Sequence, residues 1–348
     1  MKTLKRLKFF IPVLIVLLSL LAVGCTGQQK EKVENTKETK SQEPKEVLTL
    51  RTVSFLPRNH PLAAVVPRFG EIVKEKSNGE IIINYMGGPE IIPTVQLAEA
   101  VQKGQTIDIG FSASSHYQAL VPEGLAMPLS RIYPWEERET GFSDQMVKYH
   151  EKANLAYLGR WMYSPFYLWS KKPVTNPEDL RGMRMRTLAL SDRFMKELGV
   201  VPVTIMPADT YTALERGIAD GFAWAVLGAR DEGWTDKIKY LIAHPFFDMQ
   251  NTTIIMNLDK MNSLKPEQQK ILTEATKQFE REMVEYFKKA IDDELKILKE
   301  KEGVKIIEFT PDEAEKYTDT AYEVEWKALG EKIPAEVVTE LRKLTEKK

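Results

Sequence analysis

From Val47 onward, short stretches of β-forming residues alternate with longer helical stretches, and this alternation constrains the fold more than any other feature. The stretches 47–55, 80–86 and 106–112 have the character of strands. Two helical patterns, 61–79 and 94–104, separate them, and each ends in glycine, a residue that often terminates a helix. Strand–helix–strand units of this length predict parallel strands and an α/β fold.

The same scheme returns in the middle of the chain, which suggests two lobes of similar build. Strands are expected at 182–187, 201–205 and 219–225, with helices at 191–199 and 209–217 between them. We predict one lobe from residues 47–161 with about 250–290, and a second from 162–249 with about 291–348.

The C-terminal third has a different pattern. Apolar residues at helical spacing predict one continuous helix from Pro266 to Lys301. Such a helix is longer than one small lobe, so we expect it to lie across both lobes. A strand is expected at 303–309, and "TPDE" at 310–313 is typical of a capping box that opens another helix.

The N-terminus predicts export. Four basic residues precede the apolar run 9–23, which suits a signal peptide at 1–24 and is too short for a spanning helix. The run ends in "LAVGC", which resembles the lipobox of bacterial lipoproteins and makes Cys25 the predicted lipidation site. The alternative is an ordinary cleaved leader with a chance cysteine. Residues 25–46, poor in apolar residues, are expected to form a disordered tether.

Composition excludes several functions. A single cysteine excludes disulfides and cysteine-ligated metal sites. Without the leader the chain has 45 basic and 50 acidic residues, a net charge of −5, which argues against nucleic acid as a partner. The four histidines lack metal-ligand spacing, and no nucleophile-elbow, Walker A or dinucleotide motif occurs. We therefore predict no enzyme activity and no cofactor.

Ligands of parallel α/β proteins bind at the carboxyl ends of strands, where several loops of this chain should meet. Glu90 in "GGPE" and His116 in "SASSHY" lie in two of these loops. An aromatic cluster at 161–169 and 222–224 is best explained by core packing, except for Trp224 at the end of its strand.

The stretch "DLRGMRMRT" contains three arginines. Side chains alternate along a strand, so Arg184 and Arg186 should share one face, while Arg181 precedes the strand as a solvated charge. A guanidinium is expensive to bury without an anion, and Arg186 lies nearest the carboxyl end, where it could bind a ligand carboxylate through two hydrogen bonds. An internal salt bridge is the alternative that spacing leaves open.

The stretch "DLRGMRMRT…MKELGVVPVTIMPADTYTALERGIADGFAW" resembles the central signature of DctP-type solute-binding proteins of tripartite ATP-independent periplasmic (TRAP) transporters. Arg184 replaces the usual lysine, and the similarity extends from Leu48 to the C-terminus. The resemblance implies a two-lobed periplasmic-binding-protein fold, type II-like, with a long C-terminal helix bridging the lobes. It implies hinge closure on an organic acid whose carboxylate is held by Arg186, followed by delivery to a small and a large membrane subunit.

On this basis the expected ligand-binding residues are those near the strand ends and the aromatic cluster: Arg186, Trp224, Arg160, Tyr163, Phe166, Glu90 and His116. Phe166 stands where the sialic-acid branch has a second arginine. Ala223 replaces the carboxylate that the keto-acid branch pairs with its tryptophan, which argues against a metal-assisted site. These departures favour a monocarboxylate with an apolar or aromatic body.

Three other functions fit less well. A sensory lipoprotein would share the fold and ligand but signal to a membrane receptor. An ABC-type binding protein is disfavoured by the Arg186 motif and the long helix, and a surface-anchored enzyme by the missing catalytic signatures. We expect an extracytoplasmic protein, held by its lipid at the outer face of the cell membrane or in the periplasm.

Overall fold

The computed structural model describes residues 47–187, 191–249 and 251–346. The described residues lie in one compact unit that extends from Lys45 to the C-terminus. The predicted signal peptide, the tether and Cys25 fall outside the described residues, so their predictions stand as made.

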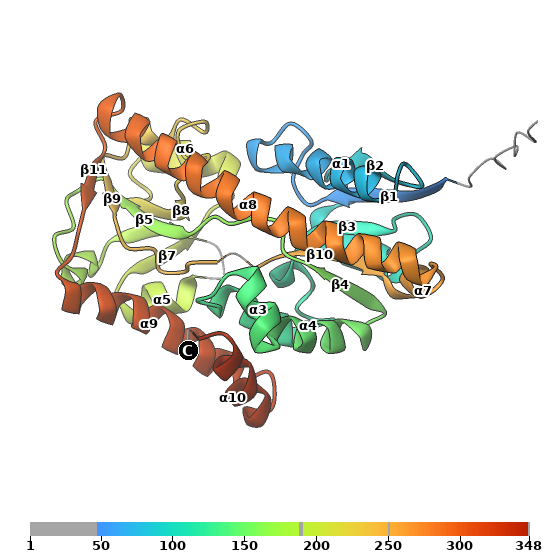
Figure 1. Cartoon of the computed structure of the whole chain (residues 1–348). Coiled ribbons are helices and arrows are strands. Elements are labelled where there is room, and N and C mark those ends of the chain that lie inside the picture. Colours follow the sequence, from blue (N-terminus) through green and yellow to red (C-terminus); the bar gives the residue numbers. More distant parts are fainter. Residues whose placement is uncertain (1–46, 188–190, 250, 347–348) are drawn as a thin grey trace, which may run out of the picture. The chain divides into compact units, whose positions relative to one another are not determined.

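Within this unit the strands form two separate sheets, which gives the mixed α/β, two-lobed architecture expected from the sequence (Figure 1). The first sheet has the order β2 (Ile81–Gly87), β1 (Leu48–Ser54), β3 (Ile109–Ala113), β10 (Thr252–Asn257) and β4 (Leu155–Gly159). Strand β1 is parallel to β2 and β3, whereas β10 is antiparallel to both of its neighbours.

The second sheet has the order β11 (Lys305–Ile307), β9 (Tyr240–Ile242), β5 (Phe166–Ser170), β8 (Gly221–Ala225), β6 (Arg184–Thr187) and β7 (Val201–Thr204). Strand β6 is parallel to β7 and β8, so their carboxyl ends meet at one edge. Strand β5 is antiparallel to β8. The chain passes between the sheets from β4 to β5 and returns from β9 to β10.

Helices follow the strands much as the sequence predicts. The described α-helices are α1 (Val66–Lys76), α2 (Leu97–Lys103), α3 (Pro134–Thr140), α4 (Phe142–Glu151), α5 (Asp192–Glu197), α6 (Pro207–Glu215), α7 (Leu258–Asn262), α8 (Pro266–Glu300), α9 (Pro311–Leu329) and α10 (Ala335–Leu344). Short 3₁₀ helices occupy Pro61–Val65, Thr94–Gln96, Ser114–Tyr117, Pro122–Leu129, Pro177–Leu180 and Trp234–Asp236. Among the described residues, none of the helices has the length and apolar character needed to cross a membrane.

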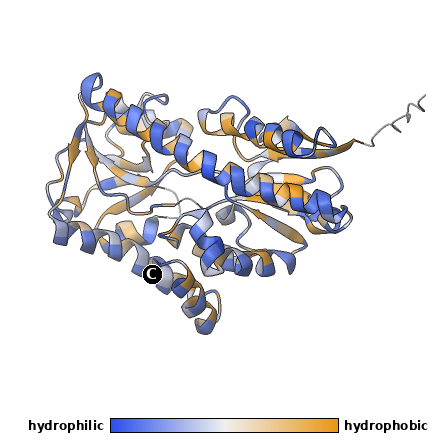
Figure 2. Cartoon of the chain, in the orientation of Figure 1, coloured by the Kyte–Doolittle hydropathy of each residue, from blue (hydrophilic) through white to orange (hydrophobic). Residues whose placement is uncertain are grey.

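The long helix α8 confirms the prediction from apolar spacing and contacts the cores of both sheets (Figure 1). Its first half contributes Leu272 and Phe279 to the core around β1 and β3, and its last turns contribute Ile291 and Leu298 to the core around β8. Figure 2 shows the matching pattern, with apolar residues on the strands and hydrophilic ones on the outer side of the helix.

The capping box at α9 is also confirmed, since the Thr310 backbone N–H donates to Glu313 Oε2 at 3.0 Å. Helix α9 packs against α5 and also against the 3₁₀ helix Pro122–Leu129, while α10 contacts α4. The C-terminal helices therefore touch elements associated with both sheets, and the sequence assigned about 291–348 to the second lobe and to bridging helices. We accordingly propose that this segment belongs to both lobes.

Candidate functional site

Arg186 is the centre of the candidate site, and the end of β6 carries it into the interior. The residue is 0 % exposed. Its Nε donates to the carbonyl oxygen of Ile205 at 2.9 Å, and Nη1 lies 3.5 Å from the carbonyl oxygen of Ala223. Among the described residues, Nη2 has no hydrogen-bond partner. The guanidinium therefore keeps at least one donor for another molecule.

Two tryptophan rings flank this guanidinium. Its Cζ lies 5.1 Å from the centroid of the Trp224 ring and 5.6 Å from that of Trp234, and the two rings are 5.4 Å apart. No ion pair joins Arg186 to an acidic side chain in the described part of the chain, and burial lowers the pKa of Arg186 to about 10. The cation is thus held by aromatic faces and carbonyl oxygens and lacks a neutralising charge.

The neighbouring arginines have different surroundings. Arg184 shares a strand face with Arg186 but lies at the exposed start of β6, where Nη2 pairs with Asp220 Oδ1 at 2.9 Å. Arg181 is exposed and pairs with Glu178. Arg184 is therefore held by an internal ion pair, the prediction that Arg181 is a solvated charge is confirmed, and of these three arginines only Arg186 is buried.

Three of the predicted ligand-binding residues are aromatic: Trp224, Phe166 and Tyr163. Trp224 has a buried Nε1 without a hydrogen-bond partner among the described residues. Phe166, half-buried, meets the edge of the Trp224 ring at 6.4 Å between centroids. Tyr163 lies on the segment between the sheets and packs against the cores of both. Trp161, Trp169 and Phe222 are fully buried, as core packing requires.

Two predicted residues belong to the first sheet's side. His116 contacts the edge of Phe55 at 4.8 Å between centroids, its Nδ1 is without a partner in the described chain, and burial lowers its pKa to about 4. It is therefore neutral at pH 7. Glu90 is exposed, and its Oε1 accepts a hydrogen bond from the Gly88 backbone at 2.7 Å, which lowers its pKa. Glu90 thus stabilises its own loop.

Arg160, the other predicted cation, has an acidic partner inside the protein. Both it and Glu137 have side chains only 1 % exposed, and two hydrogen bonds of 2.6 and 2.8 Å join them. Its Nη2 also donates to the Met127 carbonyl oxygen. From these contacts we propose that Arg160 stabilises the first lobe and does not bind the ligand.

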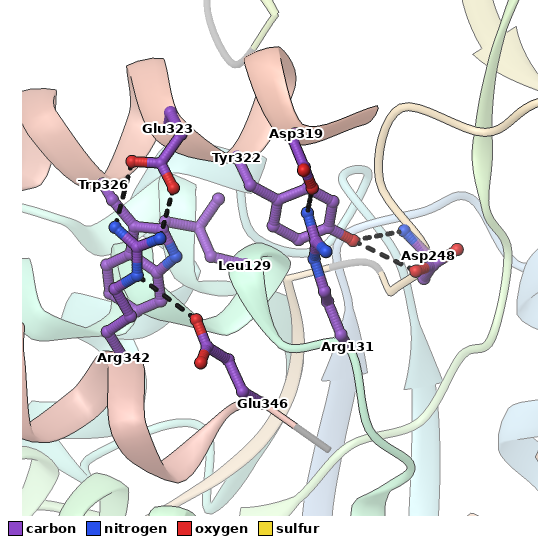
Figure 3. A pocket seen from close by; sticks show the side chains of 9 residues that line it. All are labelled: Leu129, Arg131, Asp248, Asp319, Tyr322, Glu323, Trp326, Arg342 and Glu346. Atoms are coloured by element: carbon purple, nitrogen blue, oxygen red, sulfur yellow. Dashed lines mark hydrogen bonds and ion pairs between the residues drawn. The ribbon is translucent and has the colours of Figure 1, made fainter. Parts of the chain in front are cut away.

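A separate hollow lies between the loop at Leu129–Arg131, α9 and α10 (Figure 3). It measures about 550 Å³. Its charges are already paired, since Arg131 bonds to Asp319 at 2.7 Å and Arg342 to Glu323. Tyr322, beneath Arg131, bonds to Asp248. Because these charged side chains already bond to one another, they do not offer a ligand an unpaired charge as Arg186 does.

Metal binding finds no support at these positions. Within the described ranges, no three histidine, cysteine, aspartate or glutamate side chains gather as a metal site would require.

Sequence reasoning missed Trp234, which forms the second wall around Arg186. It lies ten positions after Trp224 in a loop, "DEGWTDK", that carries no strand or helix period. The only available signal was an aromatic residue directly after Gly233, which adopts a left-handed conformation with φ 71°. Ser114, considered below, lies in the loop "SASSHY", from which sequence reasoning selected only His116, and Asn251 was not selected.

Comparisons with known proteins agree with this fold. The model of the DctP family, described as bacterial extracellular solute-binding protein, family 7, matches residues 52–332. The "Monocarboxylate 2-oxoacid-binding periplasmic protein all3028" of Nostoc sp. is 26% identical over 59% of this chain and 58% of its own length.

Two solved structures show the same architecture. A TRAP periplasmic solute-binding protein from Ochrobactrum anthropi has a TM-score of 0.76 at 22% identity, covering 86% of this chain and 96% of that one. DctP7, a Bordetella pertussis extracytoplasmic solute receptor binding pyroglutamic acid, has a TM-score of 0.71 at 17% identity, covering 86% of this chain and 100% of that one.

Proposed function

The chain belongs to family 7 of the bacterial extracellular solute-binding proteins, which are receptors and not enzymes, and from this premise we propose that it captures an organic acid at Arg186. The ligand carboxylate would accept hydrogen bonds from the guanidinium, beginning with the donor on Nη2. Arginine suits this role because its planar fork matches the geometry of a carboxylate.

One observation carries the proposal, which is the buried and unneutralised charge of Arg186. An isolated charge away from water is costly, and proteins avoid the cost by pairing it. A ligand carboxylate supplies the missing charge only while it is bound. Arg160 has the same burial but an internal partner, so it has no comparable reason to bind an anion.

The surroundings of Arg186 support a particular kind of acid. Trp224 and Phe166 offer an aromatic edge and face next to the guanidinium. We therefore infer a monocarboxylate with an apolar or aromatic body, in preference to a sugar acid. Tyr163, which packs against both cores, and His116 would complete the contacts to the ligand.

We further propose how binding serves transport. Ligand that touches both lobes would favour their closure, since a ligand shifts an equilibrium toward the state it binds more tightly. The closed form would then deliver the acid to the small and large membrane subunits of a TRAP transporter. Lipidation at Cys25 would hold the protein at the outer face of the membrane during this cycle.

A thermal-shift screen of organic acids tests the proposal. Ligand binding stabilises a protein by mass action, so an acid that binds should raise the Tm of the wild type and not that of Arg186→Ala. Arg184→Ala, which removes an exposed arginine of the same strand, is the matched control and should keep the shift. A full shift in Arg186→Ala would refute the role of Arg186, and tight binding of sugar acids alone would refute the ligand class.

A further inference from the structure

The first sheet ends in a group of buried polar atoms that the function proposed so far does not use. Ser112 Oγ, Ser114 Oγ and Asn251 Nδ2 are all buried, and none has a hydrogen-bond partner in the described chain. Ser114 is 0 % exposed and Asn251 is 6 % exposed. Buried polar groups are nearly always satisfied, so a group of unsatisfied atoms at a strand end is a candidate contact for a bound molecule.

Strand register places these side chains on one face of the sheet. In the antiparallel pair of β3 and β10, Thr252 lies opposite Ala113 and Thr253 opposite Ser112. One step further, the Ser114 backbone N–H donates to the Asn251 carbonyl oxygen at 2.8 Å. Because side chains alternate along a strand, Ser112, Ser114 and Asn251 point to the same side. Ser114 and Asn251 form the last pair of this ladder, just beyond the end of β3 and the start of β10; this end of the ladder is called the sheet's edge below.

The chain path brings this edge close to Arg186. Phe247 forms a bridge with Phe166 in the second lobe, and Phe166 contacts the Trp224 ring that covers the guanidinium. Asn251 follows Phe247 by four residues, a span of at most about 14 Å in extended chain. Ser114 and Asn251 therefore lie at the first lobe's end of a short crossing, and the other end of that crossing, Phe247, connects to Arg186 through Phe166 and Trp224.

The chemistry at this edge is neutral. A hydroxyl and an amide form hydrogen bonds without adding charge, and the neighbouring His116 ring is uncharged at pH 7. The arginines of the first lobe nearest in the chain path are already paired, Arg160 with Glu137 and Arg131 with Asp319. Arg58, on the loop after β1, is the exception: it donates to the Tyr85 carbonyl oxygen and has no ion pair among the described residues.

We propose that Ser114 and Asn251 bind a neutral polar group, a hydroxyl, carbonyl or amide, on the part of the ligand farthest from the carboxylate held by Arg186. The inference rests on the proposed function and narrows its ligand class to monocarboxylates with such a group. The hydroxyl of Ser114 can donate or accept, and the Asn251 Nδ2 donates.

Titration calorimetry on the purified full chain tests this with matched pairs of acids. In each pair, 4-hydroxyphenylacetate with phenylacetate and pyroglutamate with cyclopentanecarboxylate, only the first member carries the neutral polar group. For at least one pair we expect the polar member to bind the wild type at least fivefold more tightly than its partner, as one hydrogen bond provides. Succinate should bind more weakly than that polar member.

Two variants locate the contact. Ser114→Ala and Asn251→Leu should each weaken binding of the polar acid about five- to tenfold and leave its apolar partner unchanged. Ser112→Ala is the matched control, because its hydroxyl is equally unpartnered but lies two residues before Ser114, within β3. Since Ser114 Oγ loses no protein partner, the Tm of the ligand-free Ser114→Ala protein should not fall.

The outcomes separate this inference from the function it rests on. Equal affinities within both pairs, or a preference that survives in Ser114→Ala and Asn251→Leu, would overturn the inference, and these atoms would then bind only water. Binding that persists in Arg186→Ala would instead overturn the proposed function. A panel in which no acid binds the wild type would contradict both.

Discussion

Two buried arginines of this protein should respond to the same substitution in opposite ways. Arg186 and Arg160 are both at most 1 % exposed, but Arg160 has Glu137 as an acidic partner and Arg186 has no ion-pair partner among the described residues. Methionine is unbranched and apolar like the aliphatic part of arginine and carries no charge, so Arg186→Met and Arg160→Met each remove the guanidinium and its charge.

The magnitudes follow from the surroundings of each charge. Burial lowers the pKa of Arg186 to about 10 from an ordinary value of 12.5, which corresponds to a cost of about 3 kcal/mol. At neutral pH the folded and unfolded chains both carry this proton, so the full cost is present. The bond to Ile205 and the two ring contacts offset roughly 2 to 3 kcal/mol of it. Arg186→Met should therefore change the free energy of unfolding by no more than about 1 kcal/mol.

Arg160→Met leaves Glu137 buried without its partner. Removing one member of a buried ion pair typically costs about 3–5 kcal/mol, and we expect that loss here. Ligand affinity should show the reverse order. Arg186→Met should weaken binding of the carboxylate by about 2–5 kcal/mol, roughly 30-fold to several thousand-fold, while folded Arg160→Met protein keeps its affinity.

Urea unfolding of the ligand-free proteins measures the two changes in stability. Titration calorimetry measures the two changes in ligand affinity. The reasoning fails if Arg186→Met loses as much stability as Arg160→Met, because Arg186 would then be a structural residue. It also fails if Arg160→Met loses affinity while retaining its fold, since that would make Arg160 a ligand-binding residue, as the sequence first predicted.

Three further predictions follow from other contacts. Gly221→Ala should destabilise the protein by about 3 kcal/mol in urea unfolding, because an added Cβ would lie 2.0 Å from the Trp169 carbonyl oxygen, and an unchanged midpoint would contradict that geometry. Burial lowers the pKa of His150 to about 4, so stability should be complete above pH 6.5 and fall by about 3 kcal/mol as pH drops to 4, with a flat profile as the opposing result. Trp224→Leu should weaken binding of aromatic acids about tenfold in calorimetry, and equal affinity would remove Trp224 from the site.

The local sequence pattern was sufficient to predict most helices and strands of this fold. Helix α8 and the capping box of α9 follow from spacing and from residues within a few positions of each other. The local pattern could not predict the order of strands within each sheet, because β10 enters the first sheet between β3 and β4 from a distant part of the chain. Short strands of similar apolar content do not encode which neighbour they pair with.

The site shows where sequence reasoning stops. Alternation placed Arg184 and Arg186 on one strand face, and strand ends pointed to Arg186, but nothing in the sequence showed that Arg160 has an internal acidic partner. The difference between them is a tertiary partner, Glu137, which lies 23 positions before Arg160 on another element. A charge becomes available to a ligand when the fold buries it and provides no opposite charge, and that property belongs to the assembled surroundings of Arg186, with Trp234 as their missed member.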